Sequence, residues 1–170
     1  MIKSEKKLKE LDAVLRKDNP LKVTEAIRLL REDEPFEGAI GLLIPCFDRS
    51  ANLSVKLLIR DFMNDIKDLA LRGEVISEIR KNYSPETLRM LISSCWQSGL
   101  DYGDYANDFA EIFILKDYMT AIECFTVIES SLAQLTRPAK DSLIKILSEG
   151  SLTINSDKSA LVRELILMLR

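Results

Sequence analysis

The chain has 170 residues, with 24 Lys plus Arg, 27 Asp plus Glu, no histidine and a formal net charge of -3. The absence of histidine excludes Ser-His-Asp and Cys-His catalysis, His-ligated metal sites and imidazole pH switches. The negative charge argues against a general nucleic-acid binder, and a hydrophobic content of 46% with six Gly and five Pro excludes a disordered chain.

A chain of this length is predicted to form one domain, residues 1–170, with a core that needs no disulfide or metal. Cys46, Cys95 and Cys124 are odd in number and far apart, which predicts three buried, reduced thiols and no zinc site. The longest apolar run, residues 39–47, is too short to cross a bilayer, and no secretory signal is recognisable. We therefore expect a cytoplasmic protein with no membrane partner, metal or cofactor.

Apolar residues recur at three- and four-residue spacing along nearly the whole chain, and no stretch alternates with period two. This pattern predicts an all-α protein of about ten helices with short connections. In chain order, the expected helices are residues 4–17, a helix opened by Asn19 and Pro20, a helix opened by Pro35, and residues 53–66, 69–81, 85–98, 103–115, 118–134, 137–148 and 157–169.

Four of the five prolines fall in expected first turns, where the missing N–H costs nothing. Pro45 is the exception and predicts a kink or an early end of its helix. Polar residues one or two positions before three of these prolines are predicted N-caps, because their side-chain oxygens can accept an early backbone N–H. The predicted caps are Asn19, Ser84 and Thr136.

Core positions recur with a period of about 34 residues, which is typical of an α-solenoid of antiparallel helix pairs. The equivalent positions are Ile40, Val75, Phe109 and Leu143 in one set of helices, and Val55, Leu88 and Ile122 in the other. On this basis residues 1–18 form an N-terminal capping helix, residues 19–151 about four helix pairs, and residues 157–170 a C-terminal helix.

Turns with Asn or Asp, followed by a helix with adjacent Val and Lys or Arg, resemble HEAT-type repeats. The matching segments are residues 19–23, 52–56 and 157–163. Over about residues 19–169 the chain resembles a small bacterial HEAT-repeat protein. The resemblance implies a short HEAT-like superhelix that binds a partner, whose concave face is lined by the second helix of each pair, and it carries over no catalytic residue.

Acidic residues are concentrated in residues 90–136, where Lys116 is the only basic residue. Asp101, Asp104, Asp108 and Glu111 recur at i, i+3, i+7 and i+10, on one stripe of the expected helix. Acidic side chains with aromatic neighbours are good anchors for a cationic peptide. The predicted partner-binding residues are Glu74, Glu78, Trp96, Tyr102, Asp104, Tyr105, Asp108, Glu111 and Asp141.

The alternative interpretation is an ordinary solvated acidic face, with the aromatic residues packed in the core. The sequence favours a non-catalytic scaffold that binds another protein or peptide, and the acidic stripe favours a basic segment as that partner. Two other functions stay open, a HEAT-like DNA-repair glycosylase acting on alkylated bases and a structural subunit of a larger assembly. Residues 161–170 are apolar nearly all round, so this helix either folds back into the core or forms a homodimer contact.

Overall fold

The computed structural model describes residues 2–17, 19–32 and 36–170, with the side chains from residue 5 onward. Every regular element in this part of the chain is a helix, which confirms the predicted all-α class. The chain divides into two compact units, Met1–Ser94 and Cys95–Arg170. The predicted single domain and its repeat boundaries stay predictions.

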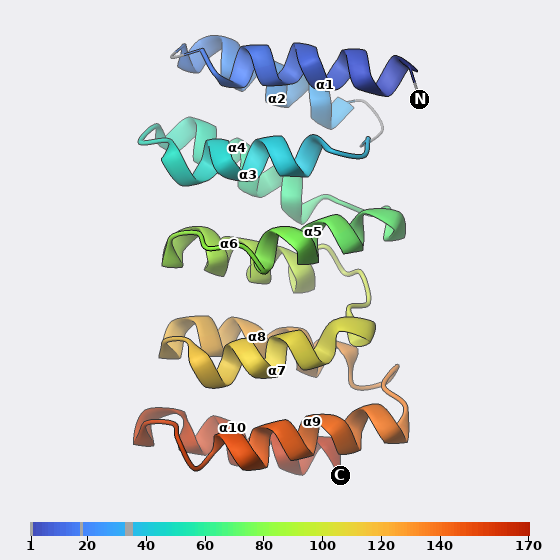
Figure 1. Ribbon diagram of the computed structural model, residues 1–170, viewed down its shortest axis with the longest axis vertical. Helices are drawn as coiled ribbons and strands as arrows, with labels where there is room; N and C mark the ends of the chain where they lie inside the picture. The colour runs from blue at the N-terminus through green and yellow to red at the C-terminus, as the bar shows by residue number, and fades with distance from the viewer. Residues whose placement is uncertain (1, 18, 33–35) are drawn as a thin grey trace. The chain divides into compact units, whose positions relative to one another are not determined.

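Ten α-helices and three short 3-10 helices make up the described residues (Figure 1). The first unit contains α1 (Ile2–Leu15), α2 (Pro20–Glu32), α3 (Ala39–Arg49), α4 (Leu53–Asn64), η1 (Leu69–Leu71) and α5 (Arg72–Ile79), and α6 (Pro85–Gln97) crosses the boundary. The second unit contains η2 (Gly103–Tyr105), α7 (Ala106–Leu115), α8 (Tyr118–Ser131), α9 (Arg137–Gly150), η3 (Ser156–Lys158) and α10 (Ser159–Leu169).

The predicted N-caps are confirmed at the starts of three helices. Asn19, Ser84 and Thr136 each accept the backbone N–H of the residue three positions later, at 3.2, 3.3 and 3.4 Å. Pro45 lies inside α3, which continues beyond it to Arg49, so this proline does not end the helix where it occurs. Pro35 itself falls outside the described residues, and the helix expected to open there begins instead at Ala39, after the non-helical residues 36–38.

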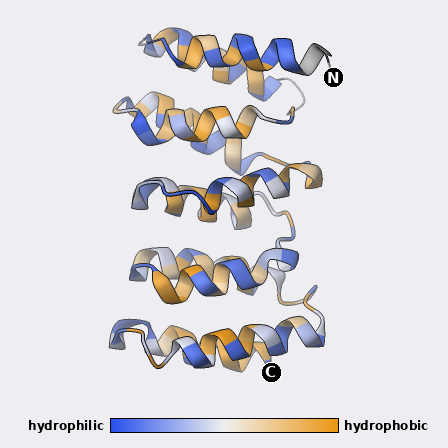
Figure 2. Cartoon of the chain, in the orientation of Figure 1, coloured by the Kyte–Doolittle hydropathy of each residue, from blue (hydrophilic) through white to orange (hydrophobic). Residues whose placement is uncertain are grey.

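Within the first unit, alternate helices along the chain lie side by side. Helix α3 packs against both α1 and α5, and α2 packs against α4. Most helices carry apolar residues on one side and polar residues on the other (Figure 2). The predicted core positions Ile40, Val75 and Val55 are buried, with exposed fractions of 0%, 1% and 3%.

The second unit repeats this arrangement. Helix α7 packs against α8 and α9, and α10 packs against α8 and α9. The predicted core residues Phe109 and Leu143 are fully buried. Ile122 is only half-buried, which corrects its assignment to the core. It points away from the buried face of α8, where Ala121 and Cys124 take the core positions.

Helix α10 buries one apolar side in the second unit. Val162, Leu165 and Leu169 are buried, Leu161, Ile166 and Met168 are half-buried, and Leu167 is 64% exposed. Packing against α8 and α9 therefore covers part of the apolar surface of this helix, and homodimerisation through it stays a prediction. None of the described helices combines the length and the apolar character needed to span a bilayer.

Polar contacts join residues separated by about one predicted period. In each unit, such contacts link alternate helices. The separations are 33 to 35 residues for four of them: Arg49 with the carbonyl of Leu15, Gly41 with Glu74, Arg31 with Asp65, and Ser142 with Asn107. Residues one period apart therefore meet in space within each unit, as a repeat of about 34 residues requires.

Asp48, near the end of α3, connects that helix to the start of α6. Its carboxylate accepts the hydroxyl of Thr87 at 2.6 Å and the backbone N–H of Ser84 at 3.1 Å. The hydrogen bonds from Thr87 and Ser84 hold the pKa of Asp48 below its ordinary value.

We expect the variant Asp48→Asn to be less stable than the wild type at pH 7. A lowered folded-state pKa means that the unfolded chain binds more protons, so the stabilisation is present above the unfolded pKa of about 3.9 and is lost as pH falls through the folded pKa. Urea unfolding at pH 7 and at pH values below about 4 measures this difference. A difference in unfolding free energy between the two proteins that stays constant from pH 7 to below about 4 would contradict the stabilising role of the ionised Asp48 carboxylate.

Candidate interaction surfaces

The acidic stripe predicted on residues 101–111 is retained in part. Gly103 donates its N–H to Asp101 at 2.8 Å, so Asp101 closes the turn before η2 and does not extend the helical stripe. Asp104 and Glu111 are exposed, and Asp108 is half-buried. We call Asp104, Asp108 and Glu111 the acidic ridge.

Asp141 lies on α9, which packs against α7, and a 3.4 Å hydrogen bond joins Ser142 to Asn107 between these two helices. The Asp141 carboxylate is exposed and forms an ion pair with Arg137 at 2.9 Å. A surface pair of this kind contributes at most about 1 kcal/mol to stability. Asp141 therefore adds little net charge to the acidic ridge.

The predicted aromatic anchors lie in different environments. Trp96 is 37% exposed, and its indole N–H donates to Glu123 at 2.8 Å. Tyr102 is only 2% exposed, and its ring stands edge-on to that of Phe109, with centroids 6.2 Å apart. Tyr105 is half-buried, 6.3 Å from Tyr102 between ring centroids. Tyr102 is therefore a core residue, as the alternative interpretation expected, and Trp96 is accessible to a partner.

Glu74 has a local structural partner at the start of α3. Its two carboxylate oxygens accept the backbone N–H groups of Gly38 and Gly41, each at 3.1 Å. Gly38 has a φ of 90°, which favours glycine. A carboxylate at this position complements the positive end of the helix dipole. Glu74, which lies on α5, thus stabilises the start of α3.

Glu78 is buried, with an exposed fraction of 3%. Its carboxylate accepts the Tyr83 hydroxyl and the Lys81 ammonium, both at 2.6 Å. Burial, followed by the hydrogen bond to Glu78, raises the pKa of Tyr83. The placement of Glu78 on a partner-binding face is therefore corrected, because a buried carboxylate with two partners cannot contact another protein without local rearrangement.

The predicted partner-binding residues also lie in two different compact units. Glu74 and Glu78 belong to the first unit, whereas the acidic ridge and Asp141 belong to the second. In the second unit α7 pairs with α8, and α9 pairs with α10. The acidic helices α7 and α9 are thus the first members of their pairs, whereas the resemblance to HEAT repeats implies a concave face lined by the second members.

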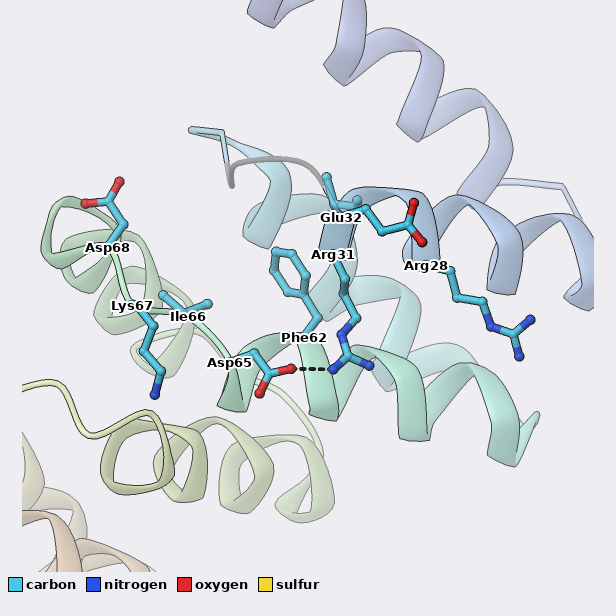
Figure 3. A pocket seen from close by; sticks show the side chains of 9 residues that line it. Arg28, Arg31, Glu32, Phe62, Asp65, Ile66, Lys67 and Asp68 are labelled. Atoms are coloured by element: carbon cyan, nitrogen blue, oxygen red, sulfur yellow. Dashed lines mark hydrogen bonds and ion pairs between the residues drawn. The ribbon is translucent and has the colours of Figure 1, made fainter.

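A cavity of about 510 Å³ lies near the ends of α2 and α4 in the first unit (Figure 3). Arg31 reaches across it to Asp65, and Phe62 forms part of its apolar wall. The lining contains three cationic and three acidic side chains, so its charge favours neither an anionic nor a cationic ligand. The cationic residues are Arg28, Arg31 and Lys67, and the acidic residues are Glu32, Asp65 and Asp68.

A buried lysine in the second unit was not predicted from the sequence. Lys158 is 5% exposed, and its Nζ donates to the carbonyls of Phe113, Ile114 and Lys116 at 2.9, 2.7 and 2.8 Å. Burial lowers the pKa of Lys158, and the charge of Asp157 opposes this. The ammonium satisfies carbonyls at the end of α7, which have no partner within the helix. Its sequence neighbours are polar, so periodicity carries no signal for its burial.

The three cysteines are buried and free, as predicted, and burial raises the pKa of each thiol. Across residues 2–17, 19–32 and 36–170, no group of three or more Cys, Asp or Glu side chains is arranged to hold a metal ion. Comparisons with protein-family models, curated proteins and solved structures gave no match. The resemblance to HEAT repeats therefore rests on the residues that carry it.

Proposed function

We propose that the chain is a non-catalytic, HEAT-like helical-repeat scaffold that binds a basic segment of a partner protein on the acidic ridge of η2 and α7. Two observations support the repeat architecture. Alternate helices pack against each other in both units, and polar contacts join residues of these helices that are about one period apart. In scaffolds of this type, each repeat contacts its neighbours and leaves extended faces for binding.

The exposure of the acidic ridge is the observation that carries this proposal. Asp104, on η2, and Glu111, on α7, are exposed, and the opposite side of α7 is occupied by the buried residues Phe109 and Phe113. Like charges one turn apart cost a helix roughly 0.2–0.5 kcal/mol per pair. Residues 90–136 carry seven acidic residues against Lys116 alone. Helix α9, which packs against α7, adds Arg137, Lys140 and Lys145 against Asp141 and Glu149, so the charge around the ridge stays negative and attracts a cationic partner.

Reversing the charge of the acidic ridge is expected to abolish partner binding without unfolding the protein. The test uses the triple variant Asp104→Lys, Asp108→Lys and Glu111→Lys, with affinity capture from native lysate followed by mass spectrometry. The proteins retained by the wild type are expected to be missing from the variant. Far-UV circular dichroism and thermal unfolding verify that the variant is folded.

A second triple variant controls for the change in net charge. Glu25, Glu149 and Glu164 are exposed and lie on α2, α9 and α10. Their replacement by lysine changes the net charge by the same amount and is expected to leave the captured proteins unchanged. Equal capture by the acidic-ridge variant and the wild type would overturn the proposed function.

A further inference from the structure

One side of α8 presents an apolar surface anchored by the tryptophan. Met119, Ile122, Glu123 and Thr126 recur at i, i+3, i+4 and i+7, so they share one face of the helix. The indole N–H of Trp96 donates a hydrogen bond to Glu123, which places the Trp96 side chain against this face. We call Trp96, Met119, Ile122 and Glu123 the α8 face.

The α8 face combines exposed apolar area with a constrained tryptophan. Met119 is 57% exposed, Trp96 is 37% exposed, and Ile122 is half-buried. Tryptophan is enriched among residues that dominate binding energy, and methionine adapts to irregular partner surfaces. The 2.8 Å bond to Glu123 restrains the indole, so less conformational entropy is lost when a partner binds.

One further exposed aromatic side chain adjoins this face. Tyr118, which is 40% exposed, precedes Ile122 by four residues on α8 and so lies beside it, whereas Leu115, which is 78% exposed, lies at the end of α7. Isolated exposed apolar residues need no explanation, whereas a group of them marks a surface for interaction. Leu152 and Leu167 are the other large apolar residues that are strongly exposed in this unit.

The charge around the α8 face selects a cationic occupant. Helix α8 carries Glu123 and Glu129 and no basic residue, and α7, which packs against it, carries Asp108 and Glu111 and no basic residue. Of the other elements packed against α8, α10 carries Arg163 and Glu164, whose opposite charges offset each other. The 3-10 helix η3 carries Asp157 and Lys158, and the buried Lys158 ammonium is held by carbonyls of α7. A lysine or arginine of a partner is attracted both by Glu123 and by the face of the indole ring.

We propose that the α8 face binds a cationic amphipathic helix of a partner protein. The apolar side chains of that helix pack against Trp96 and Met119, and its flanking lysine or arginine residues lie near Glu123, as in other helix-on-groove complexes. This inference rests on the proposed scaffold function and adds to it a second surface and the chemistry of the segment recognised there.

Trp96 is the only tryptophan of the chain, so its fluorescence reports directly on this surface. The probe is a synthetic 14-residue peptide of leucine and lysine patterned as an amphipathic helix. Titration of the full chain is expected to give a saturable blue shift of the Trp96 emission, because the peptide covers the indole. Met119→Lys and Glu123→Lys are each expected to weaken binding at least about tenfold.

Two controls separate this surface from general adhesion. The variant Leu53→Lys removes a leucine that is 69% exposed on α4 in the first unit, and it is expected to bind the peptide as the wild type does. A peptide with glutamate in place of lysine is expected not to bind. Absence of a saturable shift, unchanged affinity of Met119→Lys, or equal binding of the glutamate peptide would each overturn the inference.

The acidic-ridge variant distinguishes this inference from the proposed function. If that variant loses the peptide while Met119→Lys keeps it, the acidic ridge binds cationic segments and the α8 face does not. If Met119→Lys loses the peptide while capture from lysate is unchanged in the acidic-ridge variant, the α8 face is supported and binding at the acidic ridge is overturned.

Discussion

Replacing Lys158 by methionine is expected to destabilise the protein by about 2–4 kcal/mol. The ammonium donates to three carbonyls at the end of α7, and methionine fills a similar volume without any donor. A buried acceptor left without its donor costs about 1–3 kcal/mol, and hydrogen bonds to charged groups are among the stronger ones. The carbonyls also form the negative end of the α7 dipole, which the cation complements.

Urea unfolding followed by circular dichroism measures this loss. The matched control is Lys145→Met, which removes an exposed lysine from α9 in the same unit. The control is expected to change the free energy of unfolding by less than about 0.5 kcal/mol. Coinciding unfolding midpoints for Lys158→Met and Lys145→Met would show that the buried ammonium is not needed for the end of α7.

The truncation Phe109→Ala is expected to cost about 3–5 kcal/mol, the range measured for fully buried phenylalanines. Phe109 has an exposed fraction of 0% and occupies a position of the 34-residue period. Its ring also meets Tyr102 edge-on, an arrangement that adds about 0.5–1.5 kcal/mol beyond the buried area. The alanine variant removes both contributions and leaves a cavity beside α7.

Thermal unfolding gives the measurement, and the change in melting temperature for a chain of this size is about 2–4 °C per kcal/mol. Leu115→Ala serves as the control on the same helix, because Leu115 is 78% exposed. The control is expected to melt close to the wild type. A decrease in melting temperature for Phe109→Ala no larger than that of the control would contradict the assignment of Phe109 to the core.

Local structure was predictable because it depends on residues close together in the chain. The caps at Asn19, Ser84 and Thr136 require only a side-chain oxygen three positions before an N–H group. The buried positions Ile40 and Phe109 follow from helical periodicity, which places every third or fourth residue on one side.

The candidate site was predicted only in part. Asp104 and Glu111 are exposed as the helical pattern indicates, whereas Glu78 and Tyr102 are buried. A charged or hydroxyl-bearing residue is assigned to the surface because burial without a partner is costly. The burial of Lys158 could not be predicted from the sequence, because its partners, the carbonyls at the end of α7, lie 42–45 residues earlier in the chain.

The sequence by itself determined the helical class, the three capped helix starts, most of the recurring core positions and the acidic character of residues 90–136. Only the tertiary structure decided which acidic residues face solvent. The spacing of residues places side chains on one face of their own helix, but the covering of that face depends on helices one period away. Glu74 is therefore held at the start of α3, 33 residues earlier, while Glu111 stays at the surface.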